Sequence, residues 1–339
     1  MRLAIVGATG LVGKTMLRVL EEREPQLQPL SEIVCLASMR SAGSTVHYKG
    51  HALPVYAVAT DAFLDVDYVL MATGSDISRI YSPAAIASGS VVIDNSSAYR
   101  MQEDVPLVVP EVNPEDARHH RGLIANPNCS TIQLVVALHP LSQAFGLRRV
   151  VVSTYQSITG AGQKGLDHLQ AEVTATTPVR RISPHRLQYN TVFHSFPAGS
   201  EDTEEELKMQ LETRKIMHAP DLRIAATCVR VPIIGGHGES VALEFDRPVE
   251  PEEAREVLRR APGITVLDDP SHDLYPMPQS ARDHDDVFVG RIRKDPSCDN
   301  GLLMWVVADN LRKGAATNAI QILELLNHRE KPQEQQHVA

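Results

Sequence analysis

The fold of the first half of this chain is decided by the stretch Leu3-Ala4-Ile5-Val6-Gly7-Ala8-Thr9-Gly10-Leu11-Val12-Gly13. Residues 2–6 have the length and composition of a short buried strand, and they enter a turn with the glycine spacing G-x-x-G-x-x-G. Over residues 11–22 the apolar side chains recur with the period of a helix. A buried strand that passes through a glycine turn into a helix predicts a sheet with helices packed on it.

The glycine turn has the chemistry of a dinucleotide-binding site. Glycines let the backbone approach a pyrophosphate closely, and the helix that follows offers free N–H groups and a partial positive charge. The alternative is an ordinary strand–helix turn, which is less consistent with a position at the first such junction of the chain. We therefore expect a cofactor to contact the residues Gly7, Thr9, Gly10, Leu11, Val12 and Gly13.

The end of the second expected strand, at residues 33–37, distinguishes between two cofactors. NAD-binding proteins usually place an acidic residue there to bind the ribose 2′-hydroxyl. This chain has Ser38-Met39-Arg40-Ser41 instead, and a guanidinium suits a 2′-phosphate. Arg40, with Ser41 beside it, therefore predicts NADP, unless Arg40 is only a solvated loop residue.

The rest of the chain divides into two patterns. In the first half, short apolar runs alternate with helical ones, which predicts a mostly parallel sheet with helices on both faces. The further strands expected there lie at residues 68–72, 91–93 and 107–109, and the further helix at 78–87. After about residue 130, strands and helices are grouped differently, which suggests an α+β domain.

The expected strands of the second half lie at residues 147–158, 223–231, 240–246 and 302–308, and the expected helices at 163–175, 204–217, 251–260 and 315–326. A polar connection covers residues 178–202. The tail at residues 331–339 is polar, and we expect it to be disordered.

The composition argues against several classes of protein and of binding site. The formal net charge is −9, so no overall basic field attracts nucleic acid or an anionic membrane. The four cysteines lie far apart without a C-x-x-C pair, which argues against a disulfide framework or a zinc site, and we expect no metal. No segment has the pattern of a targeting or membrane element, so we expect a cytoplasmic location.

Cys129 is the candidate nucleophile. It follows the polar residues Asn126-Pro127-Asn128 and precedes an apolar helix expected at residues 132–138. At a helix N-terminus the pKa of a thiol falls and more thiolate forms; Ser130 or Thr131 could cap this helix. A lone cysteine is also often a buried structural residue, and these residues alone leave both possibilities open.

Further short motifs, taken in order, carry a resemblance. They are Arg40-Ser41-Ala42-Gly43, Asp94–Arg100, Val109-Pro110-Glu111-Val112-Asn113, Asn126–Thr131, Gln156–Gly162, Arg230–His237, Val287–Arg293 and Ala308–Gly314. Together with the glycine turn, they occur in the order found in the aspartate-semialdehyde dehydrogenase family, which this chain resembles from residue 1 to about residue 325. Each motif alone is weak, but their shared order is specific.

The resemblance implies a reaction and an architecture. The family reduces L-aspartyl-4-phosphate with NADPH to aspartate semialdehyde and phosphate, a step toward lysine, threonine, methionine and diaminopimelate. We expect the α/β class, with a doubly wound, mostly parallel (Rossmann-type) NADP-binding domain over residues 1–128, completed by a C-terminal helix at about 312–330. An α+β catalytic and dimerisation domain is expected over residues 129–311, and the protein is expected to be a homodimer.

The resemblance also assigns catalytic roles. Cys129 matches the nucleophile that forms a thioester, and His237 matches the residue that transfers protons. Glycines at 235, 236 and 238 suggest that His237 stands on an accessible loop. Gln156 matches the residue that orients the acyl intermediate.

The binding roles follow in the same way. Arg230 matches the residue that holds the substrate carboxylate, and Glu205 the one that pairs with its ammonium. Arg100 and Lys208 match the phosphate site, and Glu205 and Lys208 are spaced to face one side of a helix. Asn310 lies in a matched motif and is expected to contact the cofactor.

Two departures and two alternatives accompany the resemblance. Residues 194–200 depart from the family's usual pattern just before the Glu205 helix, and Met39 stands where a polar residue is more usual. One alternative is a related enzyme that acts on N-acetylglutamyl phosphate, whose blocked amine would give Glu205 no partner. The other is a non-catalytic binding protein with the same fold, an interpretation that the retained chemical residues oppose.

Overall fold

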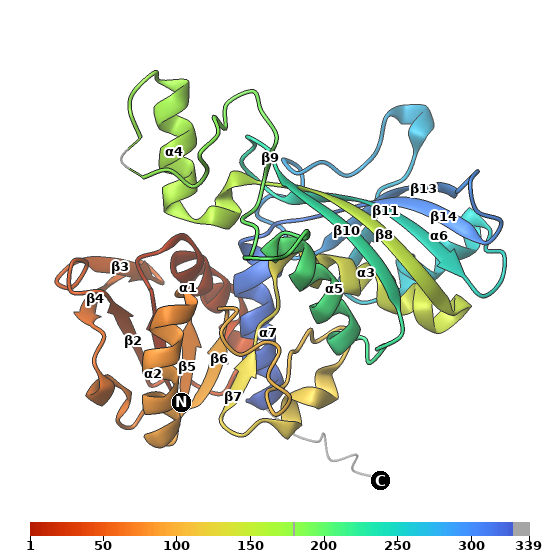
Figure 1. Ribbon diagram of the computed structural model, residues 1–339. Helices are drawn as coiled ribbons and strands as arrows, with labels where there is room; N and C mark the ends of the chain where they lie inside the picture. The colour runs from red at the N-terminus through yellow and green to blue at the C-terminus, as the bar shows by residue number, and fades with distance from the viewer. Residues whose placement is uncertain (179, 328–339) are drawn as a thin grey trace, which may run out of the picture.

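The computed structural model describes residues 1–178 and 180–327 and contains two seven-stranded sheets (Figure 1). The expected tail at residues 331–339, and the end of the helix expected at 312–330, lie outside the described residues. In the described part of the chain, no helix combines the length and the apolar character needed to cross a bilayer.

The first sheet has the strand order β3-β4-β2-β1-β5-β6-β7. Its strands are β1 (Arg2–Val6), β2 (Glu32–Ala37), β3 (Thr45–Tyr48), β4 (His51–Ala57), β5 (Tyr68–Met71), β6 (Val91–Asp94) and β7 (Leu123–Ala125). All neighbours are parallel except the β3–β4 hairpin. The mostly parallel sheet expected from the sequence is confirmed.

Helices cover both faces of this sheet, as the alternation of side chains along its strands requires. Leu3 and Ile5 of β1 pack with α1 (Leu11–Arg23) and α7 (Thr317–Leu326). Ala4 and Val6 point to the opposite face, which α2 (Ser75–Ala87) covers. The last described helix therefore packs on the first sheet, although it is far from that sheet in sequence.

One strand prediction in this half was wrong, and three strands, β3, β4 and β7, were not predicted. The strand expected at residues 107–109 makes only a single bridge, from Leu107 to Ala125. The Asn113 side chain accepts from the N–H of Val109 and donates to the carbonyl of Leu107, so these backbone groups are not available to a ladder. The β3–β4 hairpin was not foreseen; it turns at Lys49 and Gly50, which both have positive φ, as a tight hairpin turn demands.

The second sheet is mixed and has the order β12-β13-β14-β11-β8-β10-β9. Its strands are β8 (Leu147–Gln156), β9 (Val192–Phe193), β10 (Arg223–Arg230), β11 (His237–Phe245), β12 (Ile264–Val266), β13 (Val287–Lys294) and β14 (Gly301–Ala308). Three helices pack on one face: α3 (Cys129–Phe145), α5 (Glu204–Ile216) and α6 (Pro251–Arg260). Helix α4 (Gln163–Val173) stands apart from these layers in Figure 1.

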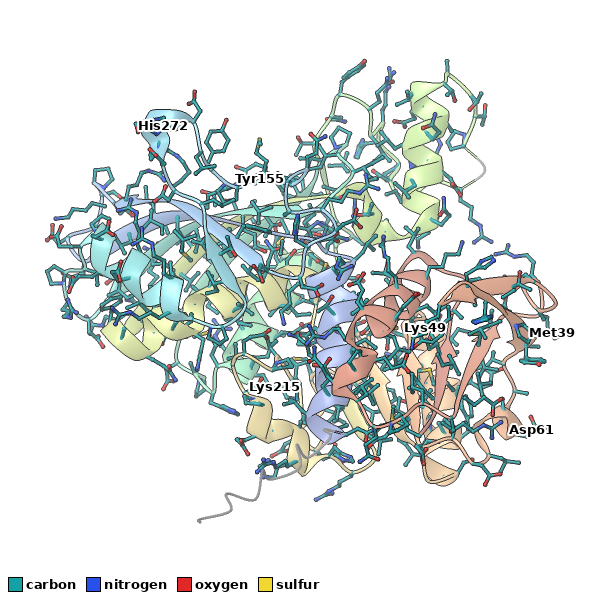
Figure 2. The ribbon with its side chains drawn as sticks, turned by 180° about the vertical axis from the view of Figure 1, so that it is seen from behind. Met39, Lys49, Asp61, Tyr155, Lys215 and His272 are labelled. Atoms are coloured by element: carbon teal, nitrogen blue, oxygen red, sulfur yellow. The ribbon has the colours of Figure 1, made fainter. Side chains whose placement is uncertain are left out.

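The other face of the second sheet is partly covered by the loop that holds Pro276, whose carbonyl accepts from Trp305 Nε1 at 2.9 Å. Tyr155 on β8 is exposed there and contacts the ring of Trp305 on β14; Figure 2 labels Tyr155 on this side.

The two halves meet where α3 begins and where the chain returns to the first sheet. A π-helical turn, Arg312–Ala316, precedes α7. Gly314 in this turn packs so closely on the start of α3 that a Cβ there would lie 2.8 Å from the Cβ of Cys129. The C-terminal segment therefore forms one side of the region that holds the candidate nucleophile.

Candidate active site

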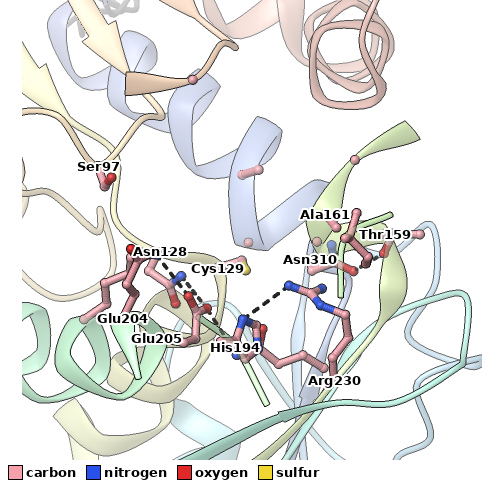
Figure 3. Close-up of a pocket in the computed structure, with 18 of the residues that line it drawn as sticks. Ser97, Asn128, Cys129, Thr159, Ala161, His194, Glu204, Glu205, Arg230 and Asn310 are labelled. Atoms are coloured by element: carbon pink, nitrogen blue, oxygen red, sulfur yellow. Dashed lines mark hydrogen bonds and ion pairs between the residues drawn. The ribbon is translucent and has the colours of Figure 1, made fainter. Parts of the chain in front are cut away.

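A cavity of about 840 Å³ opens between the two sheets. Its first-sheet wall comes from loops that follow β1, β5 and β6 and includes Val12, Ser75 and Ser97. Arg100 comes from the same loop as Ser97, and the other wall adds the five expected side chains Cys129, Gln156, Glu205, Lys208 and Arg230. Figure 3 shows Cys129, Glu205 and Arg230 around this space.

Cys129 is the first residue of α3. The cap of this helix is Asn128, whose side-chain oxygen accepts from the backbone N–H groups of Ser130 and Thr131 at 3.0 and 3.2 Å. The possibility that Ser130 or Thr131 supplies the cap is therefore wrong, because their side chains lie inside the helix while Asn128 has the extended backbone that a cap requires.

His237 contacts the thiol directly, with 3.2 Å between Nε2 and Sγ. It is fully buried as the first residue of β11, so the expectation of an accessible loop was wrong. The neighbouring glycines serve close packing: a Cβ on Gly236 would lie 2.3 Å from the Ala308 carbonyl oxygen, and one on Gly238 would collide with the Trp305 ring.

The tautomer of His237 is set by the backbone. The Ser157 N–H donates to Nδ1 at 3.0 Å, and an amide N–H can only donate. The neutral ring therefore carries its proton on Nε2, toward the sulfur. Burial lowers the pKa of His237 to about 3, and the charge of Arg230 adds to this effect.

The thiol is also neutral in this arrangement. Burial raises the pKa of Cys129 to about 12, and the charge of Glu205 raises it further, against the opposing effect of Arg100 and Arg230. The expected lowering of this pKa by the helix N-terminus was wrong, because desolvation disfavours the thiolate more than the nearby positive groups favour it.

Glu205 is the centre of a buried polar cluster. Its Oε1 accepts from Asn128 Nδ2 at 2.7 Å and from Gln156 Nε2 at 3.2 Å, and its Oε2 accepts from Lys208 Nζ at 3.2 Å. Burial alone would raise the pKa of Glu205, but the charge of Lys208 and these hydrogen bonds lower it to about 2. The cluster therefore holds a carboxylate that stays ionised inside the cavity wall.

Arg230 ends β10 and lies across the cavity from Glu205 (Figure 3). Its Nη1 donates to the Ser157 carbonyl at 3.1 Å, and its Nη2 donates to His194 Nδ1 at 3.3 Å. Burial lowers the pKa of Arg230. Among the residues that the structure describes, this guanidinium has two neutral acceptors and no carboxylate partner, so it suits an anionic ligand.

Arg100 is held by a different partner. Its Nη1 donates to Glu212 Oε1 at 3.0 Å and its Nη2 to the Asn95 carbonyl at 2.7 Å. The second oxygen of Glu212 accepts from the backbone N–H of Asn128 at 2.7 Å. Glu212 thus links a cation of the cavity wall to the loop that precedes Cys129.

The expected cofactor residues follow the glycine pattern. Gly7 has φ +87°, and a Cβ on Gly13 would lie 2.3 Å from the Gly7 carbonyl oxygen. Helix α1 begins after Gly10 with neither a side-chain cap nor an acidic residue in its first turn, which leaves its N–H groups for an anion.

The remaining cofactor residues divide into two sets. Asn310 lies in the cavity wall and accepts from the Thr159 hydroxyl at 2.9 Å. Arg40 and Ser41 lie outside that wall, beyond the end of β2, where Arg40 is exposed. Figure 2 labels their exposed neighbour Met39 at the margin of the first sheet.

Three contributors were not foreseen from the sequence: Asn128, Glu212 and His194. Asn128 had a signal, because asparagine directly before a helix is a preferred cap. Glu212 also had one, since it lies one heptad after Glu205 on the same face of α5. Nothing in the sequence selects His194, whose partner Arg230 is 36 positions away.

Comparisons with known proteins show the family of this chain. The family models "Semialdehyde dehydrogenase, NAD binding domain" and "Semialdehyde dehydrogenase, dimerisation domain" match residues 2–120 and 138–313. The aspartate-semialdehyde dehydrogenase of Aquifex aeolicus is 51% identical, and the match covers 96% of this chain and 97% of the relative.

Solved structures give the same result. Aspartate semialdehyde dehydrogenase II from Vibrio cholerae superposes with a TM-score of 0.90 at 42% identity, covering 96% of this chain and 97% of that one. The Candida albicans enzyme, solved with NADP, gives 0.74 at 28% identity, covering 96% and 98%. The resemblance deduced from the sequence is confirmed, and this chain belongs to the aspartate-semialdehyde dehydrogenase family.

Proposed function

We propose that this protein reduces L-aspartyl-4-phosphate with NADPH to L-aspartate 4-semialdehyde and phosphate, within the synthesis of lysine, threonine, methionine and diaminopimelate. The observation that carries the proposal is the contact of 3.2 Å between Cys129 Sγ and His237 Nε2, inside a cavity that also holds Arg230, Glu205 and Lys208. A nucleophile, a proton carrier and charges for an amino-acid substrate are thereby present in one place.

Cys129 attacks the acyl carbon in the proposed first step. A carbon–sulfur bond forms, the bond from carbon to the phosphate oxygen breaks, and a thioester remains on the enzyme. Because the resting thiol is neutral, its proton must leave as the new bond forms. Restraint of the Asn128 loop by Glu212 keeps the sulfur in place for this attack.

His237 accepts the thiol proton and later returns a proton to the oxygen that develops at the reduced carbon. The resting tautomer already carries a proton on Nε2, so Nε2 can take the thiol proton only after the ring proton has moved to Nδ1. The imidazolium that then forms has one proton on each nitrogen, and its Nδ1–H opposes the Ser157 N–H. We infer that this hydrogen bond lengthens during turnover.

The substrate's charged groups have separate places in the proposal. Arg230 binds the α-carboxylate, and the ionised Glu205 binds the ammonium. Arg100 and Lys208 bind the phosphoryl group, while Gln156, already fixed by Glu205, orients the acyl oxygen. The buried Glu205 carboxylate supports an amine-bearing substrate over N-acetylglutamyl phosphate, whose amine is blocked.

The first sheet fits NADP. The space that a Cβ on Gly13 would fill lets the backbone approach a pyrophosphate, and the uncapped α1 supplies N–H groups. We propose that Gly7, Thr9, Gly10, Leu11 and Val12 line the pyrophosphate site with Gly13. Arg40 and Ser41 then hold the 2′-phosphate, and Asn310 contacts the cofactor near Cys129. When bound, NADPH supplies the hydride that reduces the thioester.

The proposal also covers the domain boundary, the oligomeric state and the cellular location. We place the domain boundary near residue 128, with residues 129–311 forming the second domain, because the two sheets separate there and α7 packs back on the first one. The exposed aromatic side chain of Tyr155 supports a homodimer through the second sheet. Four unpaired thiols suit a reducing cytoplasm.

The test is phosphate-dependent reduction of NADP by the purified protein with L-aspartate 4-semialdehyde, followed by absorbance. We expect Cys129→Ala to lose at least about 10³-fold in rate. The matched control is Cys298→Ala, which removes another partly exposed thiol and should change the rate little. A folded protein that binds NADP but forms no NADPH would contradict the proposal.

A further inference from the structure

His194 belongs to the stretch that departs from the family pattern, yet the fold places it in the cavity wall. It directly follows β9, whose Val192 pairs with Arg230 in the antiparallel register of β9 and β10. This pairing, rather than any local motif, brings the imidazole next to the guanidinium. Figure 3 marks the contact between these two side chains with a dashed line.

The contact fixes the state of both groups. Arg230 can only donate, so Nδ1 of His194 is an acceptor and the neutral ring carries its proton on Nε2. The Ser157 carbonyl accepts from the other terminal nitrogen of Arg230. Two acceptors from different strands therefore determine the plane and direction of the guanidinium.

The second ring nitrogen of His194 is unusual. Nε2 of His194 is buried, and it has no hydrogen-bond partner in the described part of the chain. Buried donors are nearly always satisfied, so a bare one in a cavity wall calls for an explanation. Glu205, in the same wall, accepts from Asn128, Gln156 and Lys208, and the described structure has no hydrogen bond from His194 Nε2 to it.

We propose that His194 is part of the subsite for the substrate's α-carboxylate. Its Nδ1 positions Arg230, and its Nε2–H is kept for a carboxylate oxygen that enters beside the guanidinium. His194 thus acts as a positioning residue through Arg230 and as a specificity-determining donor. This inference rests on the proposed function, because that function supplies the carboxylate.

The test compares two aldehydes that differ only in this group: L-aspartate 4-semialdehyde and 3-aminopropanal, which lacks the carboxylate. His194→Phe removes both ring nitrogens, whereas His194→Asn keeps an oxygen acceptor near the position of Nδ1 and lacks the far N–H. His51→Phe, a change at an exposed histidine of β4, is the matched control. The Michaelis constant for phosphate reports whether the rest of the site is intact.

We expect His194→Phe to raise the Michaelis constant for the semialdehyde by about tenfold or more, with kcat and the constant for phosphate little changed. His194→Asn should recover part of this loss, and His51→Phe should match the unsubstituted protein. With 3-aminopropanal, kcat/KM should be the same for all four proteins, because no carboxylate is present to be bound.

Equal losses with both aldehydes, or no loss with either, would overturn the role of His194 while leaving the proposed function intact. If the unsubstituted protein turns over neither aldehyde, the proposed function fails and the carboxylate subsite fails with it.

Discussion

The two sheets of this molecule meet their ligands in opposite ways. On the first sheet, the expected cofactor site is mostly backbone: a glycine turn, an uncapped helix end and an exposed arginine at the end of β2. On the second, the site consists of buried ionised side chains that hold one another, with Glu205 and Glu212 at the centre. The cofactor site is formed by residues that are close in sequence, whereas the catalytic site is formed by residues that are far apart in sequence.

This contrast has a kinetic consequence. Changes to the first sheet's turn should act on cofactor binding and leave the chemistry of a bound complex nearly intact. Changes to the second sheet's cluster should reduce kcat, because they displace the groups around Cys129. Each prediction below tests whether a residue belongs to the side to which the structure assigns it.

The largest effect is expected for Glu212→Ala. This change leaves Arg100 buried without its carboxylate and frees the Asn128 N–H. Loss of one partner of a buried pair costs about 3–5 kcal/mol in stability, and we expect kcat to fall by about 10²–10³-fold because a displaced loop misplaces the sulfur. Urea unfolding and steady-state kinetics measure the two effects.

Glu212→Gln is the matched control for that experiment. The amide keeps an acceptor for Arg100 and the shape of the side chain, so kcat should be recovered in large part. If the alanine variant instead raised only the Michaelis constant for NADP, the assignment of Glu212 to the catalytic side would be wrong.

The next effect is expected for Gly13→Ala in the first sheet. Its Cβ would lie 2.3 Å from the Gly7 carbonyl oxygen, and backbone atoms cannot yield as a side chain can. We expect a loss of about 1–3 kcal/mol in stability and weaker NADP binding by titration. In Gly10→Ala the same oxygen would be 3.3 Å away, so that variant should lose much less; equal losses would contradict the steric explanation.

The pH dependence of Cys129 alkylation tests the buried state of the catalytic side. Only the thiolate reacts, and burial raises the pKa of this thiol to about 12. Its fraction as thiolate therefore increases about tenfold with each pH unit below that value. Iodoacetamide labelling, followed by peptide mass spectrometry, should accelerate from pH 7 to 10 without a plateau; a plateau below pH 8 would indicate an activated thiol.

The sequence predicted most of the first sheet because its signals are local. The turn at residues 7–13, the parallel strands and the return of α7 each follow from a short pattern or from the family resemblance. The strand expected at residues 107–109 was wrong because the Asn113 side chain, four to six positions along the chain, hydrogen-bonds to the backbone of Val109 and Leu107. Apolar periodicity carries no information about such a competitor.

The residues of the active site were predicted, but their protonation states and tautomers were not. The resemblance named Cys129 and His237, and the structure brings them together. The neutral thiol and the tautomer of the imidazole could not be foreseen, because they depend on burial and on the Ser157 amide. The role of His194 could not be predicted for a similar reason, because it depends on the register of β9 and β10.

The smallest effect is expected for a change of Arg40. It tests whether cofactor binding by the first sheet needs a side chain in addition to the backbone turn. Arg40 is exposed beyond the end of β2, so its interaction with a 2′-phosphate is screened by solvent and salt. We expect Arg40→Ala to raise the Michaelis constant for NADP by about tenfold, or about 1.4 kcal/mol, and to leave that for NAD and kcat unchanged. The difference should shrink at high ionic strength. If the Michaelis constants for NADP and NAD are both unchanged, Arg40 is a solvated loop residue, and the backbone turn alone accounts for cofactor binding. If kcat falls as well, the cofactor site on the first sheet and the catalytic site on the second are coupled, although different residues form them.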